Sequence, residues 1–280
     1  MKQKLVSLAV FGAMMAVGAS AALAAAPADW SKVPKTDIHV FHPGVAPIEW
    51  VQGKGEHSGA SGLKKGESCA GCHIEDGKLS LDVKRLQSKE LEPKGAPKVG
   101  TYPVGVQAAY DATNLYVRLT FKAPAGGADK SDKENAVKAS LMFPNAQVPM
   151  GEQIGCWATC HQDARTMPGA DDKKTKYVKG GAFDLLQWRS SNKSFDGSVT
   201  DKRTMEGGKA GANAEGTKAG DTYTVTFTRK LAGNAVLAAG KAVTFGVAIH
   251  ADNAGGRFHH VSFNQTIGLG ADGDIKAVKQ

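Results

Sequence analysis

Apolar and polar side chains alternate with a period of two over much of the chain after about residue 100. In residues 104–123, two such runs are separated by DATN, which predicts a β-hairpin. Alternating runs recur, with glycine-rich loops between them, in residues 136–144, 221–231, 242–252 and 257–267. Several half-buried strands without long helices between them predict a mainly β protein built as an antiparallel β-sandwich.

Two regions lack this alternation. Residues 27–98 are rich in Gly, Lys, Pro and His, with one short helix expected near residues 79–92, and predict a small irregular, partly helical module. Residues 192–220 are polar and glycine-rich and predict a surface loop. The expected organisation is therefore an N-terminal module over residues 27–98, followed by the sandwich domain over residues 99–280.

The N-terminus predicts export. Lys2 and Lys4 precede an uncharged apolar run, which ends in small residues that offer a cleavage site near Ala24 to Ala26. Residues 1–26 are thus expected to be a cleaved signal peptide, and the mature protein is expected in the periplasm. No later apolar run is long enough to cross a bilayer, so we do not expect an integral membrane protein.

The formal net charge of the whole chain is +8, and its lysines are interspersed with acidic residues. Aromatic and basic residues do not interleave as they do on nucleic-acid-binding surfaces, so a nucleic-acid partner is not expected. A docking face for an acidic redox partner is compatible with this charge but is not indicated by any one segment.

All four cysteines lie in two short motifs, each followed by a histidine. Cys69, Cys72 and His73 form CxxCH, the attachment signature of c-type haem, in which two thiols form thioethers and the histidine binds the iron. Cys156 and Cys160 have one more residue between them and precede His161. The sequence therefore predicts two covalently bound haem c groups, with His73 and His161 as proximal ligands.

Three other uses of these cysteines agree less well with the sequence. Two disulfides are the usual outcome in an oxidising compartment, but they do not explain the short spacings or the histidines. A zinc site needs four clustered ligands, whereas the motifs are more than eighty residues apart. A thioredoxin-like pair normally opens a helix in a βαβ unit, which this region does not resemble.

An iron that only carries electrons needs a ligand on its second face. For the first haem, three histidines lie upstream in the same module. His57 can fold back through a glycine-rich loop and is the leading candidate, followed by His42 and then His39.

For the second haem, strand alternation separates two adjacent histidines. His259 shares a strand face with Val261 and Phe263, and this more apolar face is expected to point inward. His259 is therefore the leading candidate, and His260 and Met150 are the alternatives.

Several segments together resemble a known family. AYDATNLYVRLTF, the PMG within Val148 to Gly151, CWATCH and GRFHHVSF are similar to the haem-binding domain of ethylbenzene dehydrogenase and related dimethyl-sulfoxide-reductase-family enzymes, over roughly residues 100–280. The resemblance implies a β-sandwich that holds one haem and exchanges electrons with a molybdenum-enzyme partner. FHPGVAPIEWVQGKGEHSGA before CAGCH resembles a module of periplasmic dihaem cytochromes.

The resemblance also implies ligands, with one departure. Family members hold a noncovalent haem b by a methionine in a PMG-like segment, which Met150 matches, and by a lysine near the end of the chain, where this sequence has His259. The added Cys156, Cys160 and His161 depart from the family. With His161 on one side of the iron, only one inherited ligand can be kept, and the resemblance does not decide between Met150 and His259.

The resulting hypothesis is a periplasmic dihaem c-type cytochrome that carries single electrons and is not an enzyme. Its donor and acceptor are not identified by the sequence, which leaves docking at a membrane-bound partner open. The alternative is a dihaem enzyme, a peroxidase or a reductase of a small nitrogen or sulfur oxide, which needs an open haem site. A haem-based sensor is a third class, for which the sequence has no dedicated signal.

Overall fold

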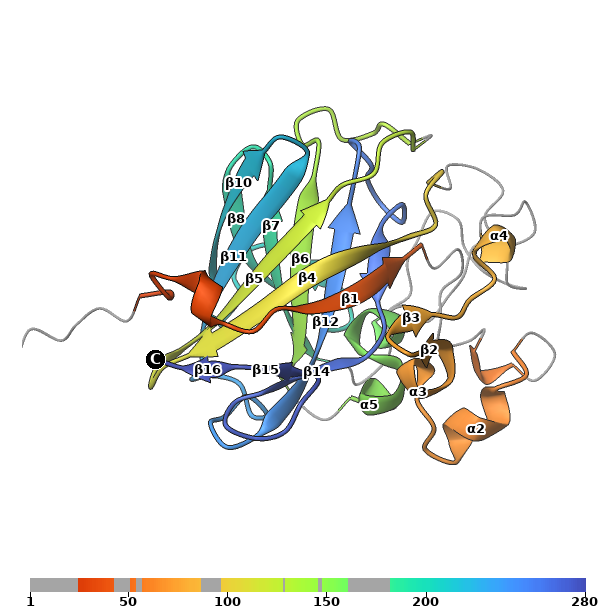
Figure 1. Ribbon diagram of the computed structural model, residues 1–280, viewed down its shortest axis with the longest axis horizontal. Helices are drawn as coiled ribbons and strands as arrows, with labels where there is room; N and C mark the ends of the chain where they lie inside the picture. The colour runs from red at the N-terminus through yellow and green to blue at the C-terminus, as the bar shows by residue number, and fades with distance from the viewer. Residues whose placement is uncertain are drawn as a thin grey trace, which may run out of the picture.

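The structure, a computed structural model, describes residues 25–42, 51–53, 57–86, 97–127, 129–145, 148–160 and 182–280. Strands account for 42% of these described residues and helices for 12%. The strands form a broad sheet that folds over on itself, and most of the short helices gather beside one end of it (Figure 1). The expected mainly β, antiparallel sandwich is confirmed.

Sixteen strands occur in the described residues, nine of them long. The long strands are β1 (Thr36–Phe41), β4 (Thr101–Tyr110), β5 (Asn114–Lys122), β6 (Lys138–Pro144), β7 (Phe183–Arg189), β8 (Lys193–Val199), β10 (Asn213–Ala219), β11 (Thr222–Lys230) and β12 (Ala242–His250). The short strands are β2 (Ile74–Glu75), β3 (Lys78–Leu79), β9 (Arg203–Thr204), β13 (His260–Ser262), β14 (Gln265–Gly268), β15 (Ile275–Lys276) and β16 (Val278–Lys279). The helices are η1 (Trp30–Lys32), α2 (Ala60–Lys64), α3 (Cys69–His73), α4 (Val83–Leu86), α5 (Gly151–Ile154) and α6 (Cys156–Thr159).

Most strands belong to one hydrogen-bonded path in the order β10-β11-β5-β4-β1-β13-β12-β6-β7-β8-β9. Neighbours along this path are antiparallel, while β14 pairs in parallel with β15 and β16 with β4. The hairpin predicted in residues 104–123 is present as β4 and β5, with Tyr110 opposite Leu115. Asp111 closes its turn by accepting hydrogen bonds from the backbone amides of Thr113 and Asn114.

The two faces of the sheet bury two different apolar clusters. Alternation along β6 sends Leu141 and Phe143 into the sandwich core, and Met142 to the opposite face. The same alternation in β12 places Val247 in the core and Ala248 opposite. We call this opposite cluster the motif-side cluster, because Cys69, Cys156 and Cys160 belong to it; its other buried members are Phe41, Val51, Leu63, Met142, Val148, Ile154, Trp157, Ala158, Phe183, Leu185, Val199, Ala248, Val261 and Phe263.

Several sequence-based expectations were wrong in detail. Residues 36–41, expected to be irregular, form β1, which pairs with β4 and β13 inside the sheet. Residues 192–220, expected to be a surface loop, contribute β8, β9 and β10. Strand β7 was not predicted, and residues 257–267 form two short strands, β13 and β14, rather than one. The division between a module and a sandwich domain at residue 98 stays a prediction, as does the signal peptide, most of which lies outside the described residues.

Candidate functional site

Helix α3 contains the first cysteine motif. Its N-cap is Ser68, whose hydroxyl accepts a hydrogen bond from the Gly71 amide at 3.0 Å, so the CAGCH segment begins a helical turn. Cys69 is buried in the motif-side cluster, whereas Cys72 is exposed. The two thiols are three residues apart and so lie on neighbouring positions of one helical face, but they differ in burial.

A small hairpin follows α3 and returns to His73. Strands β2 and β3 are joined at Asp76 and Gly77, both with positive φ, as a two-residue hairpin turn requires. This places the Ser80 carbonyl oxygen 2.9 Å from His73 Nδ1. The contact puts the proton on Nδ1 and leaves the lone pair on Nε2, which is the arrangement of a metal-binding histidine.

His57, like His73, has its Nδ1 atom next to a backbone carbonyl oxygen. Its Nδ1 lies 3.0 Å from the Val51 carbonyl oxygen, and its ring centroid is 6.2 Å from that of His73. Two imidazoles that share one metal ion by bonds of about 2.0 Å have ring centres about 6.3 Å apart. Gly59 supports this placement, since a Cβ there would lie 2.8 Å from His57 Cε1. The ring distance is compatible with His57 and His73 holding one metal ion, and their roles as ligands stay predictions.

Helix α6 contains the second cysteine motif. Gly155 precedes it with a φ of +86°, and Cys156 and Cys160 are 1% and 2% exposed. Trp157 packs against β12, where a Cβ at Gly246 would come within 2.4 Å of its ring. The motif is therefore held against the sheet by an indole that only a glycine accommodates. His161 lies outside the described residues, so its role as proximal ligand stays a prediction.

His259 is oriented toward this second motif. Its ring centroid is 6.0 Å from that of Trp157, and its Nδ1 lies 2.9 Å from the Arg257 carbonyl oxygen. The ring of His250 stacks on it at 4.9 Å and 16°. Burial lowers the pKa of His250 to about 3, so this neighbour is neutral at physiological pH. His259 thus lies beside the second motif, and its role as a ligand stays a prediction.

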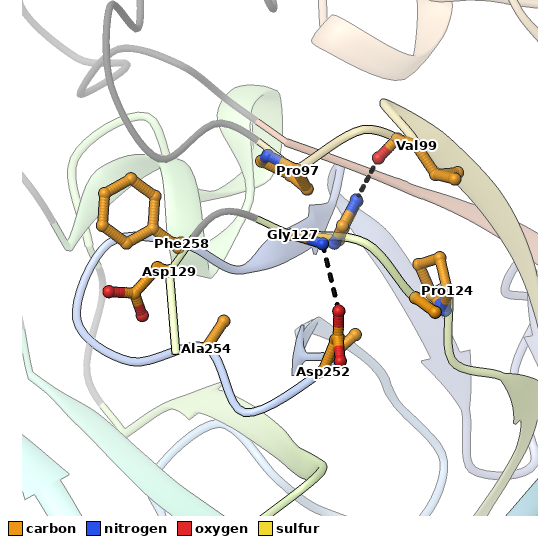
Figure 2. Close-up of a pocket in the computed structure, with 11 residues that line it drawn as sticks. Pro97, Val99, Pro124, Gly127, Asp129, Asp252, Ala254 and Phe258 are labelled. Atoms are coloured by element: carbon orange, nitrogen blue, oxygen red, sulfur yellow. Dashed lines mark hydrogen bonds between the residues drawn. The ribbon is translucent and has the colours of Figure 1, made fainter. Parts of the chain in front are cut away.

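His260 and His42 have other surroundings. The Nε2 of His260 lies 2.7 Å from the Val99 carbonyl oxygen, at the wall of a small pocket next to Pro97 and Pro124 (Figure 2). Its ring is thereby fixed with the proton on the nitrogen that usually binds haem iron. His42 instead has Nδ1 3.3 Å from the His259 carbonyl oxygen, and its buried Nε2 has no hydrogen-bond partner within the described structure.

Burial lowers the pKa of His42 and of His260 to about 4 each, so both are neutral. The His259 carbonyl next to His42 Nδ1 leaves His42 Nε2 without a proton, so His42 stays the alternative ligand for the first haem. His260 Nε2 instead donates to the Val99 carbonyl oxygen, which makes His260 a weaker alternative for the second haem.

Met150 lies nearer to the first motif than the sequence suggested. Its sulfur accepts a hydrogen bond of 2.8 Å from Gln52 Nε2, and Gln52 follows Val51, the partner of His57. Met150 begins α5 in a left-handed conformation and packs on the motif-side cluster. Met150, the alternative ligand for the second haem, thus contacts Gln52 near the first motif as well as preceding α6 in the chain.

The pKa values of all four thiols are raised in this fold. All four cysteines are free, and burial raises the pKa of Cys69 and of Cys160 to about 12 each. Burial also raises the pKa of Cys156 well above its usual value, and burial and then Glu67 raise that of Cys72. Redox-active pairs have lowered thiol pKa values, so these data argue against a thioredoxin-like pair.

The two motifs lie on the same side of the sheet. Helix α3 contacts α5, and α6, which follows α5, contacts β12 (Figure 1). The Ala70 amide donates a 3.2 Å hydrogen bond to Asn264 Oδ1. The ring of Phe263 stacks on His73 at 5.8 Å and 20°. The packing of the first motif against the face that contains the second, which an electron relay requires, is confirmed.

Sequence reasoning missed the residues that position these histidines. Ser80 could have been found, because the DG pair in HIEDGKLS is a hairpin signal that returns the chain to His73. Val51, Phe263 and Asn264 could not, because their contacts depend on how distant segments pack.

The fold and the paired motifs define the class to which this protein belongs. The family model described as ethylbenzene dehydrogenase matches residues 27–221, and the chain belongs to this family. The match begins at residue 27 and not near residue 100, and it ends before β11. The N-terminal segment is thus part of the family match, in agreement with the position of β1 inside the sheet.

Two relatives resemble the chain more specifically. Cytochrome c-552 of Stutzerimonas stutzeri is 50% identical over the full length of both chains. Cytochrome c-551 of Rhodocyclus tenuis is 44% identical over 90% of this chain and 99% of its own. Among solved structures, a family 9 carbohydrate-binding module from Caldicellulosiruptor kristjanssonii in complex with cellotriose covers 57% of this chain and 64% of its own, at 10% identity and a TM-score of 0.31, which is too low to support an inference.

Within the described residues, no helix is both long and apolar enough to cross a membrane.

Proposed function

We propose that this protein is a periplasmic c-type cytochrome with two covalently bound haems that carries single electrons between respiratory redox partners. The observation that carries the proposal is the His57–His73 pair beside the CxxCH helix, whose ring centres are 6.2 Å apart. The relatives named cytochrome c-552 and cytochrome c-551 support the same class. The predicted signal peptide supports the location.

Each haem, when bound, supplies a one-electron iron couple, and the chain supplies attachment and orientation. Cys69 and Cys72 would hold the first haem, and Cys156 and Cys160 the second. The Ser80 and Val51 carbonyl groups orient His73 and His57 through their Nδ1 atoms. Two histidines on one iron favour a lower reduction potential than histidine and methionine, which suits a carrier on the reducing side of a respiratory chain.

The partner belongs to the same proposal. Membership of the ethylbenzene dehydrogenase family makes a molybdenum-enzyme oxidoreductase the candidate donor or acceptor, with docking directly to that enzyme or to a membrane-bound protein. The exposed Cys72 marks the part of the first site that a partner approaches most readily.

The first test is the haem count of the mature protein, expressed with c-type maturation machinery. Intact mass and the reduced pyridine-haem spectrum should give two covalent haems for the wild type and one for Cys156→Ser/Cys160→Ser. One haem in both proteins would refute the second attachment site.

A second test separates a carrier from an enzyme. Spectra recorded with cyanide, nitric oxide or peroxide should show slow reaction or none, because protein ligands would occupy the sites on each iron that these molecules need. Rapid binding or turnover would favour a dihaem peroxidase or a reductase of a small oxide instead.

A further inference from the structure

Two residues between β13 and β14 touch both cysteine motifs. Phe263 and Asn264 interrupt the strand that the sequence predicted as continuous, and they lie where α3 and α6 approach the sheet. Nothing in their own residue types marks them as part of a redox site. Their contacts with each motif come from separate observations.

The contacts with the first motif are a hydrogen bond and a ring stack. Asn264 Oδ1 accepts a 3.2 Å hydrogen bond from the amide of Ala70, the residue after Cys69. The Phe263 ring lies 5.8 Å from that of His73 at an interplanar angle of 20°, and it also contacts the ring of Phe41, at 4.6 Å. Phe263 and Asn264 therefore fix both the start of α3 and the plane of its histidine.

The contact with the second motif is a close backbone approach. A Cβ at Gly155 would lie 2.7 Å from the backbone nitrogen of Asn264 and 2.8 Å from its Cα. Gly155 directly precedes Cys156 and has a φ of +86°, which favours glycine. The turn that begins α6 thus rests on the backbone of the same residue whose side chain holds α3.

We propose that Phe263 and Asn264 act as a shared clamp, by which we mean that they position both haem-attachment segments, α3 and α6. Because both segments contact these two residues, a displacement of one segment should also shift the other. This inference rests on the proposed two-haem function for its redox consequence. The positioning of the two segments depends only on the contacts of α3 and α6 with Phe263 and Asn264. Asn264 is a positioning residue in this scheme, because it acts through Ala70 and Gly155 and not on a haem.

The first experiment tests the hydrogen bond between the Ala70 amide of α3 and the Asn264 side chain. Asn264→Ala removes the acceptor of the Ala70 amide, while Asn264→Asp keeps an oxygen in the same place. In the haem-loaded ferrous protein, exchange of the Ala70 amide with solvent should be about fivefold faster in Asn264→Ala and close to wild type in Asn264→Asp. Equal exchange in wild type and Asn264→Ala would overturn the clamp.

The second experiment tests the coupling from the opposite side. Gly155→Ala forces a Cβ against Asn264 and should speed Ala70 exchange and shift the midpoint potential of the first haem, although the substitution adjoins the second motif. Gly151→Ala is the matched control, because its Cβ would meet only Val148, at 3.4 Å. A Gly155→Ala protein whose Ala70 exchange and first-haem potential match those of the control would refute the coupling.

Asn264→Ala provides the reciprocal measurement if Gly155→Ala does not fold. The Thr159 amide donates to the Gly155 carbonyl oxygen at 3.2 Å within α6, and its exchange should also become faster when Asn264 is truncated. Unchanged Thr159 exchange would contradict the clamp. A haem count of one would refute the two-haem function and leave the exchange results to decide the clamp, whereas two haems without any cross-effect would refute only the clamp.

Discussion

Replacing Gly246 by alanine should loosen the second motif from the sheet. Gly246 lies in β12, and a Cβ there would be 2.4 Å from Trp157 Cδ1 and 2.9 Å from Trp157 Nε1. Trp157 is 9% exposed, so its indole has little room to move away. The added methyl group must therefore displace α6 or bend the strand.

The magnitude follows from two opposing effects. Overpacking a filled site costs about 1–3 kcal/mol, and exchanging glycine for alanine recovers about 0.4–1 kcal/mol through the unfolded chain. A net destabilisation of about 1–2 kcal/mol should lower the melting temperature of a protein of this size by roughly 2–8 °C. The spectrum of the second haem should change with it.

Gly105→Ala is the matched control within β4. A Cβ at Gly105 would meet Lys35 Cδ at 2.9 Å, but that side chain is 54% exposed and can move aside. Its melting temperature should stay near wild type or rise slightly. Equal melting temperatures and an unchanged second-haem spectrum in Gly246→Ala, measured by circular dichroism and visible absorption, would show that Trp157 does not pack on β12 as described.

Three further outcomes follow from particular contacts. His57→Met should raise the reduction potential of the first haem, as histidine–methionine ligation does, and a spectroelectrochemical titration with unchanged midpoints would exclude His57 as a ligand. Asp184→Ala leaves the guanidinium of Arg229, which is 1% exposed, without its buried partner and should cost about 3–5 kcal/mol in denaturant unfolding. Burial raises the pKa of Asp132, but hydrogen bonds led by that from Lys138 outweigh it and lower the pKa to about 2, so its stabilisation is present above about pH 4 and is lost as the pH falls toward 2. Acid unfolding should be less steep in Asp132→Asn over that window, and identical profiles would contradict this role.

The sequence predicted those parts of the fold in which local pattern and burial agree. The hairpin of β4 and β5 combines alternating apolar residues with a turn at Asp111, and both signals are local. Strand β1 was missed because its neighbours β4 and β13 are distant in sequence and its TDIHVF segment is too short to show a period. Strand β10 was missed because NAEGTKA is a polar edge strand, whose residues read as a loop.

The site shows the same division between local and distant information. The cysteine spacing and the strand alternation around His259 are local, and they indicated the face on which Trp157 and His259 meet. The sequence could not predict which ring nitrogen of each histidine is free of a proton and able to bind a metal ion. That depends on backbone carbonyl groups supplied by other segments. Val51 supplies that carbonyl for His57, and Val99 supplies it for His260.

The division of the sheet into two faces explains how this fold can hold redox groups without weakening its core. Because side chains alternate along β6 and β12, the residues that close the sandwich and those that receive the cysteine motifs belong to the same strands but never to the same cluster. A change at Trp157 or Cys156 therefore disturbs the motif-side cluster first. Substitutions such as those at Gly246 and Gly155 should accordingly alter haem spectra at temperatures well below the loss of the sandwich.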